Sequence, residues 1–134
     1  MAKTYTDYKQ TDRLVELGFD LSTTDMFCTE DGGASNFPIC SSDGEKHYRE
    51  AWSLSALLGL LPEVIKSEGK FGWSFQSLHI MKEQVEYGCW TESSTWSVMI
   101  SSPQGELVDA AFNMLCWLVE NGYLNPRKKE GEAI

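Results

Sequence analysis

The sequence has 134 residues, of which 42% are hydrophobic and 12% aromatic, so it holds enough apolar material for the core of one domain. We therefore exclude a largely disordered chain and expect one globular domain over 1–124, followed by a mobile tail at 125–134. No stretch reaches the roughly 18 consecutive apolar residues of a membrane span, and no apolar segment follows Lys3 as it would in a signal peptide. A cytoplasmic protein without a membrane partner is expected.

The formal net charge of −9 is unevenly distributed along the chain. Between 14 and 45 there are seven acidic residues and no lysine or arginine, and between 83 and 126 there are six acidic residues and again no lysine or arginine. Phosphate backbones are bound by clustered lysine and arginine, so direct nucleic-acid binding is not expected. The distribution fits a basic protein partner as well as an ordinary solvated acidic surface.

The first predicted helix covers 11–17, where apolar and charged residues follow each other at helical spacing. Thr11 or Asp12 is expected at its N-cap, because a short polar side chain there accepts from a free amide of the first turn. Gly18 is expected to end the helix in the left-handed conformation.

The next segment predicts a hairpin. A strand is expected over 23–29, a turn over 30–36, which contains an Asp-Gly pair, and a return strand over 37–41. Pro38 has no amide hydrogen for a ladder, so the return strand is expected at a sheet edge. The polar segment 42–50 then leads into the next helix.

The most apolar stretch, 50–65, predicts a core helix. Four leucines recur at helical spacing and share one face of this helix: Leu54, Leu57, Leu58 and Leu61. Ser53 is expected at its N-cap, and Pro62 is expected to kink the helix before one further turn through Ile65. A turn is predicted at 66–70.

The remaining chain predicts a sheet and a final helix. Alternating apolar and aromatic residues indicate antiparallel strands near 71–82, 84–91 and 94–101. Ser102 and Pro103 are expected to open a helix of about 17 residues that ends at Gly122. The predicted fold is therefore α+β: a small antiparallel sheet of three to five strands, two main helices packed on one face, and a short N-terminal helix.

The cysteines and histidines indicate no catalytic, cofactor or metal site. Cys28, Cys40 and His47 match no common zinc spacing, and the sequence has none of the usual nucleophile motifs. Whether Cys28 and Cys40 pair in a disulfide stays open. His79 alternates with its apolar neighbours, so it is expected on the surface.

The aromatic residues are more informative, because the sheet segment holds more large rings than one face can bury. Rings that remain exposed beside carboxylates are typical of a protein-binding surface. The residues predicted for such a surface are Trp73, Tyr87, Trp90 and Trp96 from the sheet, with Asp109, Asn113 and Glu120 from the polar side of the last helix.

Three segments carry a resemblance: Ala-Trp-Ser-Leu-Ser-Ala-Leu-Leu-Gly-Leu-Leu-Pro at 51–62, Leu-Val-Asp-Ala at 107–110, and Trp-Leu-Val-Glu-Asn-Gly-Tyr-Leu at 117–124. Their order resembles that in a group of small uncharacterised proteins encoded by prophages and mobile elements of anaerobic gut bacteria, over roughly 24–124. The resemblance implies a phage or mobile-element origin. It transfers no catalytic residue, because the group has no assigned activity.

Two functional hypotheses follow. The favoured one is a non-enzymatic protein-interaction module that binds a protein partner, in particular a basic one, through its acidic and aromatic surface. The alternative is a small hydrolase or ligand-binding protein with a cleft between the sheet and the leucine-rich helix. The oligomeric state is not predicted.

Overall fold

The computed structural model describes residues 4–29, 34–35, 48–69 and 72–126. The elements in these ranges are α1 (Tyr8–Leu17), a 3-10 turn η1 (Leu21–Thr23), β1 (Met26–Thr29), β2 (Ala34–Ser35), β3 (Tyr48–Ala51), α2 (Leu54–Leu60), β4 (Val64–Gly69), β5 (Gly72–Ile80), β6 (Val85–Trp90), β7 (Trp96–Ser101) and α3 (Leu107–Glu120). Within the described residues, no helix is long and apolar enough to cross a membrane.

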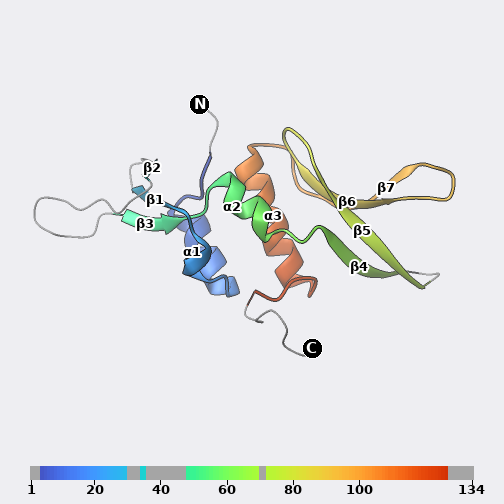
Figure 1. The fold of residues 1–134 in the computed structure, drawn as a ribbon, viewed down its shortest axis with the longest axis horizontal. Helices are drawn as coiled ribbons and strands as arrows, with labels where there is room; N and C mark the ends of the chain where they lie inside the picture. Colours follow the sequence, from blue (N-terminus) through green and yellow to red (C-terminus); the bar gives the residue numbers. More distant parts are fainter. Residues whose placement is uncertain (1–3, 30–33, 36–47, 70–71, 127–134) are drawn as a thin grey trace, which may run out of the picture.

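The strands form two antiparallel sheets rather than the single one expected. The smaller has the order β2-β1-β3 and the larger the order β4-β5-β6-β7. The helices lie between the two sheets, and the larger sheet extends away from them, with the β6–β7 hairpin at its far end (Figure 1). The α+β class and the short N-terminal helix are confirmed.

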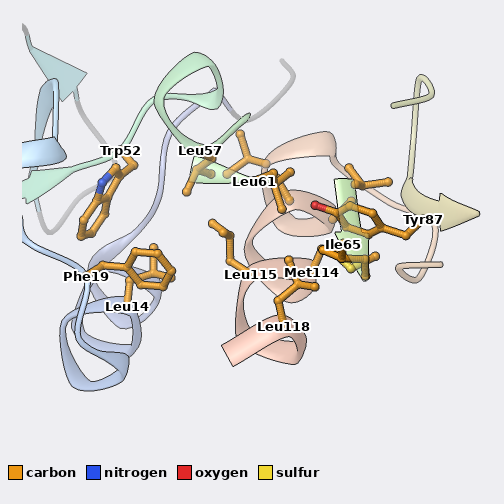
Figure 2. Close-up of a cluster of buried hydrophobic side chains, with 14 residues drawn as sticks. Leu14, Phe19, Trp52, Leu57, Leu61, Ile65, Tyr87, Met114, Leu115 and Leu118 are labelled. Carbon is orange, nitrogen blue, oxygen red and sulfur yellow. The ribbon is translucent and has the colours of Figure 1, made fainter. Parts of the chain in front are cut away.

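One hydrophobic core connects the helices, Trp52 after β3, and one face of the larger sheet. Figure 2 shows it running from Leu14 and Trp52, through Leu57 and Leu115 between α2 and α3, to Tyr87 of the larger sheet. All five side chains are buried. The larger sheet is therefore anchored to the helices by one of its two faces.

Two helix starts differ from the prediction. The N-cap of α1 is Asp7, whose side chain accepts from the Gln10 amide while the Gln10 side chain accepts from the Asp7 amide. The helix starts before Thr11 because this reciprocal cap lies upstream, whereas Gly18 ends it in the left-handed conformation as expected. The helix α3 starts after Glu106, because the Ser102 hydroxyl accepts from the Val85 amide and is not available as a cap.

The leucine-rich helix α2 has Ser53 as its N-cap, as predicted, but it ends earlier than expected. Leu61 has extended backbone angles, as expected for a residue before proline. The further turn through Ile65 and the turn predicted from Lys66 are wrong as far as Gly69, because β4 runs from Val64 to Gly69 and pairs with β5, while Lys70 lies outside the described residues. Pairing with β5, in register from Val64 opposite Ser77 to Gly69 opposite Gly72, outweighs the local turn signal there.

The three strands predicted between 71 and 101 are confirmed as β5, β6 and β7. The strand predicted over 23–29 is confirmed as β1, but β3 was missed within the polar segment 42–50. The return strand predicted over 37–41 lies outside the described residues, as does most of the tail at 125–134. At the end of α3, the Tyr123 amide donates to the Leu118 carbonyl, so the chain folds back after Gly122.

Candidate functional site

The two faces of the larger sheet differ in what covers them. Directly paired residues of an antiparallel sheet share a face, and successive residues alternate. Leu78, Tyr87 and Ile100 are in register and belong to the face that packs on the core. The opposite face, here called the outer face, is defined by residues that alternate with these: Val64, Lys66, Phe75, His79, Glu86, Trp90, Trp96 and Val98.

The outer face is exposed and strongly apolar. The side chains of Phe75 and Trp90 are 65% and 69% exposed, and Val64 and Val98 are also exposed. Of the large hydrophobic residues exposed in the described part of the chain, four lie on this face, and Ile80 lies on the other. The exposed large hydrophobic residues are therefore concentrated on one side of the sheet rather than scattered over the surface.

Trp96 lies at the centre of an aromatic cluster on this face. Its ring centroid is 4.9 Å from that of His79 and 5.5 Å from that of Trp90, both in edge-to-face geometry. The indole packs directly over Gly88, where an added Cβ would lie 2.8 Å from Cζ2 of Trp96. The missing side chain of Gly88 is therefore what lets the ring lie against the sheet.

A buried carboxylate fixes the same ring. Glu86 is 6% exposed, and its Oε1 accepts from Nε1 of Trp96 at 3.0 Å. The same oxygen lies 3.5 Å from Nδ1 of His79. Trp96 is thus held by packing and by a hydrogen bond, with a negative charge beside it in the sheet.

The structure supports the surface position of only some predicted residues. Trp90 and Trp96 lie on the outer face, whereas for Trp73 the structure describes only the strand that carries it. Tyr87 is a correction: it is fully buried, its hydroxyl donates to the Pro62 carbonyl at 2.7 Å, and burial raises its pKa. It belongs to the core because it is in phase with Leu78 rather than with Trp90.

The predicted residues of α3 lie away from the aromatic cluster. Asp109 accepts from the Gln10 side chain at 2.7 Å, and Glu120 forms an ion pair with Arg13 at 2.7 Å. These two residues hold α1 against α3. Asn113 is exposed and lines a small pocket beside the end of β7.

Several residues of the outer face were missed, although their alternation was visible. Phase with exposed His79 places Phe75 on the outer face, and register places Val64 and Val98 there. The surface position expected for His79 is confirmed by a side chain that is 56% exposed. The alternation along the strands does not by itself reveal which of the two faces of the larger sheet packs on the helices.

The cleft of the alternative hypothesis is also present. A cavity of about 720 Å³ lies between the start of α2, the β5–β6 turn and the start of α3, and its lining includes Leu54, Lys82, Glu83 and Glu106. Both glutamates are exposed residues, and the described residues that line the cavity include no histidine.

The cysteines do not add a reactive centre in the part of the chain that is described. Cys28 is a free, buried thiol whose pKa is raised by burial, while Cys40 and His47 lie outside the described residues. Burial also raises the pKa of Cys116, to about 11. Within the described ranges, no cluster of three or more histidine, cysteine, aspartate or glutamate side chains is arranged to hold a metal ion.

Comparisons of the chain with protein-family models, with curated proteins and with solved structures find no match.

Proposed function

We propose that this chain is a non-enzymatic protein-interaction module, and that it binds a protein partner through the outer face of the β4–β7 sheet. The observation that carries the proposal is the aromatic cluster of Trp90, Trp96 and His79 on an exposed apolar sheet face. Tryptophan contributes disproportionately to binding energy at protein interfaces. The phage or mobile-element origin implied by the resemblance is part of this proposal.

The fixed position of Trp96 supports a binding role. A side chain that is already ordered loses little conformational entropy when a partner covers it. Packing on Gly88 and the hydrogen bond to Glu86 provide that order before any partner arrives. The more exposed Trp90 and Phe75 then supply the apolar area that binding removes from water.

The charge of the β6–β7 half of this region favours a partner with basic side chains, whereas Lys66 of β4 adds one positive charge opposite Phe75. The sequence from 83 to 126 has six acidic residues and no lysine or arginine, and it includes β6, β7 and α3. A lysine or arginine of the partner gains from the tryptophan faces as well as from the buried charge of Glu86. For the same reason we expect no direct binding to nucleic acid.

The test compares capture of proteins from lysate of the source cells by three forms of the chain. The wild type is compared with the double variant Phe75→Ser/Trp90→Ser and with Ile80→Ser, which replaces an exposed apolar residue on the opposite face of the same sheet. We expect one stoichiometric partner that the double variant loses by at least about tenfold and that Ile80→Ser retains. Part of the binding should weaken between about 50 mM and about 500 mM salt.

Equal capture by the double variant and the wild type would contradict the proposal. So would loss with Ile80→Ser alone, because that result assigns the contact to the other face. Thermal unfolding of all three forms controls for loss of fold.

A further inference from the structure

The edge of the larger sheet formed by β7 is unusually open. Within the described residues β7 pairs with β6 alone, and its sequence Trp-Ser-Val-Met-Ile-Ser has no charge and no proline. The opposite edge strand, β4, includes Lys66 and Glu68. Charged residues, prolines and bulges are usual means of blocking an edge, and β7 has only a bulge at Met99, which leaves residues 96–98 open.

The backbone groups of β7 can be assigned to its two sides. The Thr91 amide donates to the Thr95 carbonyl, which starts the β6–β7 ladder. Bonded and non-bonded pairs alternate in such a ladder, so Ser97 is bonded to Cys89, whereas Trp96 and Val98 direct their N–H and C=O groups outward. A bulge at Met99, opposite Tyr87 and Gly88, interrupts the ladder, so this outward pair is the part that an added strand would reach.

A small apolar pocket adjoins the same strand. It has a volume of about 240 Å³ and lies between the end of β7 and α3, where it is lined mainly by Ile100, Pro103, Met114 and Trp117. Proteins that bind an extended peptide beside an edge strand use main-chain hydrogen bonds for affinity and such pockets for alternate side chains. The pocket is large enough for one apolar side chain.

We infer that the partner contributes an extended segment with basic side chains, which pairs with β7 at Trp96 and Val98 and places one apolar side chain in this pocket. The inference rests on the proposed protein-binding function and specifies its partner. Charge complementarity indicates a basic segment, because β6, β7 and α3 lie in the stretch that has acidic residues and no lysine or arginine. A second copy of this chain, with its net charge of −9, is disfavoured by repulsion.

The experiment measures amide hydrogen exchange by NMR on the full chain. The ligand is the strongest binder from an immobilised library of random nine-residue peptides. We expect that peptide to alternate basic and other side chains, and to slow exchange of the Trp96 and Val98 amides by at least about tenfold. The Ser97 amide is the internal control, because it is already bonded to Cys89 and should not change.

A pair of variants tests the same contact independently. Val98→Pro removes an outward N–H, which an edge strand tolerates, whereas Val98→Thr keeps that N–H with a side chain of similar shape. The peptide should bind Val98→Pro at least about tenfold more weakly than the wild type, and Val98→Thr within about twofold. If Val98→Pro does not fold, the exchange measurement still decides.

The inference is overturned if no peptide binds, if the best binders are acidic, or if bound peptide leaves the Trp96 and Val98 amides unprotected. Protection that rises with protein concentration in the absence of peptide would assign the edge to a second copy and would also overturn it. If these peptide experiments fail but Phe75→Ser/Trp90→Ser still loses a partner that the wild type captures, the proposed function stands and only the inference about the edge strand is wrong. Protection of the edge without any effect of that double variant would refute the outer face instead.

Discussion

At the scale of single residues, Gly88 determines what the outer face presents. An added Cβ there would lie 2.5 Å from the Ser97 carbonyl oxygen and within 2.9 Å of the Trp96 ring. The ring can therefore pack against the sheet only because position 88 has no side chain. The hydrogen bond from Trp96 to Glu86 depends on that position.

Replacing Gly88→Ala should lower the free energy of unfolding by about 1–3 kcal/mol, because a backbone oxygen cannot move aside as a flexible side chain can. The indole should also leave the sheet, which changes the tryptophan fluorescence of the folded state. Gly59→Ala is the matched control, since an added Cβ in α2 meets no atom within 4 Å and should stabilise by about 0.5–1 kcal/mol. Urea unfolding measures both variants, and a Gly88→Ala chain as stable as the wild type would refute this account of the cluster.

At the residue scale, Tyr87 makes the free energy of unfolding depend on pH. Burial raises its pKa above the ordinary value of 10.0, so the folded state favours the neutral phenol. Its contribution to stability is complete below pH 10 and falls as the pH rises further, because the unfolded chain loses the proton first. Cys116, with its pKa raised from 9.0 to about 11, adds a decline that begins earlier.

We expect Tyr87→Phe to lower the free energy of unfolding by about 1–2 kcal/mol at pH 7, because the partly buried Pro62 carbonyl loses its hydrogen-bond donor. The variant should also lose part of the decline in stability above pH 10. Urea unfolding between pH 7 and about pH 11 measures both effects. Parallel curves for the two proteins above pH 10 would show that Tyr87 does not carry the alkaline transition.

At the scale of elements, Gln10 connects two helices. It completes the N-terminal cap of α1 through its oxygen and donates from its nitrogen to Asp109 of α3. The ion pair between Arg13 and Glu120 lies along the same contact. Two of the residues predicted as interaction surface, Asp109 and Glu120, therefore also hold α1 and α3 together.

The substitution Gln10→Glu should keep the cap but lower the free energy of unfolding by about 1 kcal/mol at pH 7, because a carboxylate would face Asp109. The loss should diminish near pH 4, where carboxyl groups gain protons. Adding Asp109→Asn should restore most of the stability, because the new amide can donate to the glutamate. Equal stability of Gln10→Glu and the wild type would show that this contact contributes nothing.

The elements also show what could be predicted from the sequence. The leucine spacing after Ser53 and the alternation from 71 to 101 are local patterns, and the structure confirms the elements they predict. β3 and β4 were missed because their strand character comes from pairing with β1 and β5, which local spacing does not reveal. The N-cap of α3 was wrong because Ser102 is engaged by Val85 of a neighbouring strand.

The candidate site, too, could be predicted only where local sequence patterns determine it. The alternation separates the residues in phase with Tyr87 from those in phase with Trp90, but it does not say which set packs on the helices. That choice is made by α3, whose buried Met114 and Leu118 share the core with Tyr87. Tyr87 therefore lies in the interior and not on the surface where it was predicted, because α3 packs on its face of the sheet.

At the scale of the whole molecule, the described residues leave one face of the larger sheet uncovered. The helices lie between the two sheets, and the larger sheet uses a single face to join the common core (Figures 1 and 2). Its outer face consequently meets solvent with Phe75 and Trp90 largely exposed. The formal net charge of −9 is the long-range basis for the basic partner that we propose.

The most direct test of the outer face as a binding surface is site-specific photo-crosslinking in the source cells. A benzoylphenylalanine is incorporated in place of Phe75, on the outer face, or in place of Ile80, which is exposed on the opposite face of the same sheet. We predict that the probe at position 75 gives an adduct with one protein and that the probe at position 80 does not. An adduct from position 80 with none from position 75 would contradict the account.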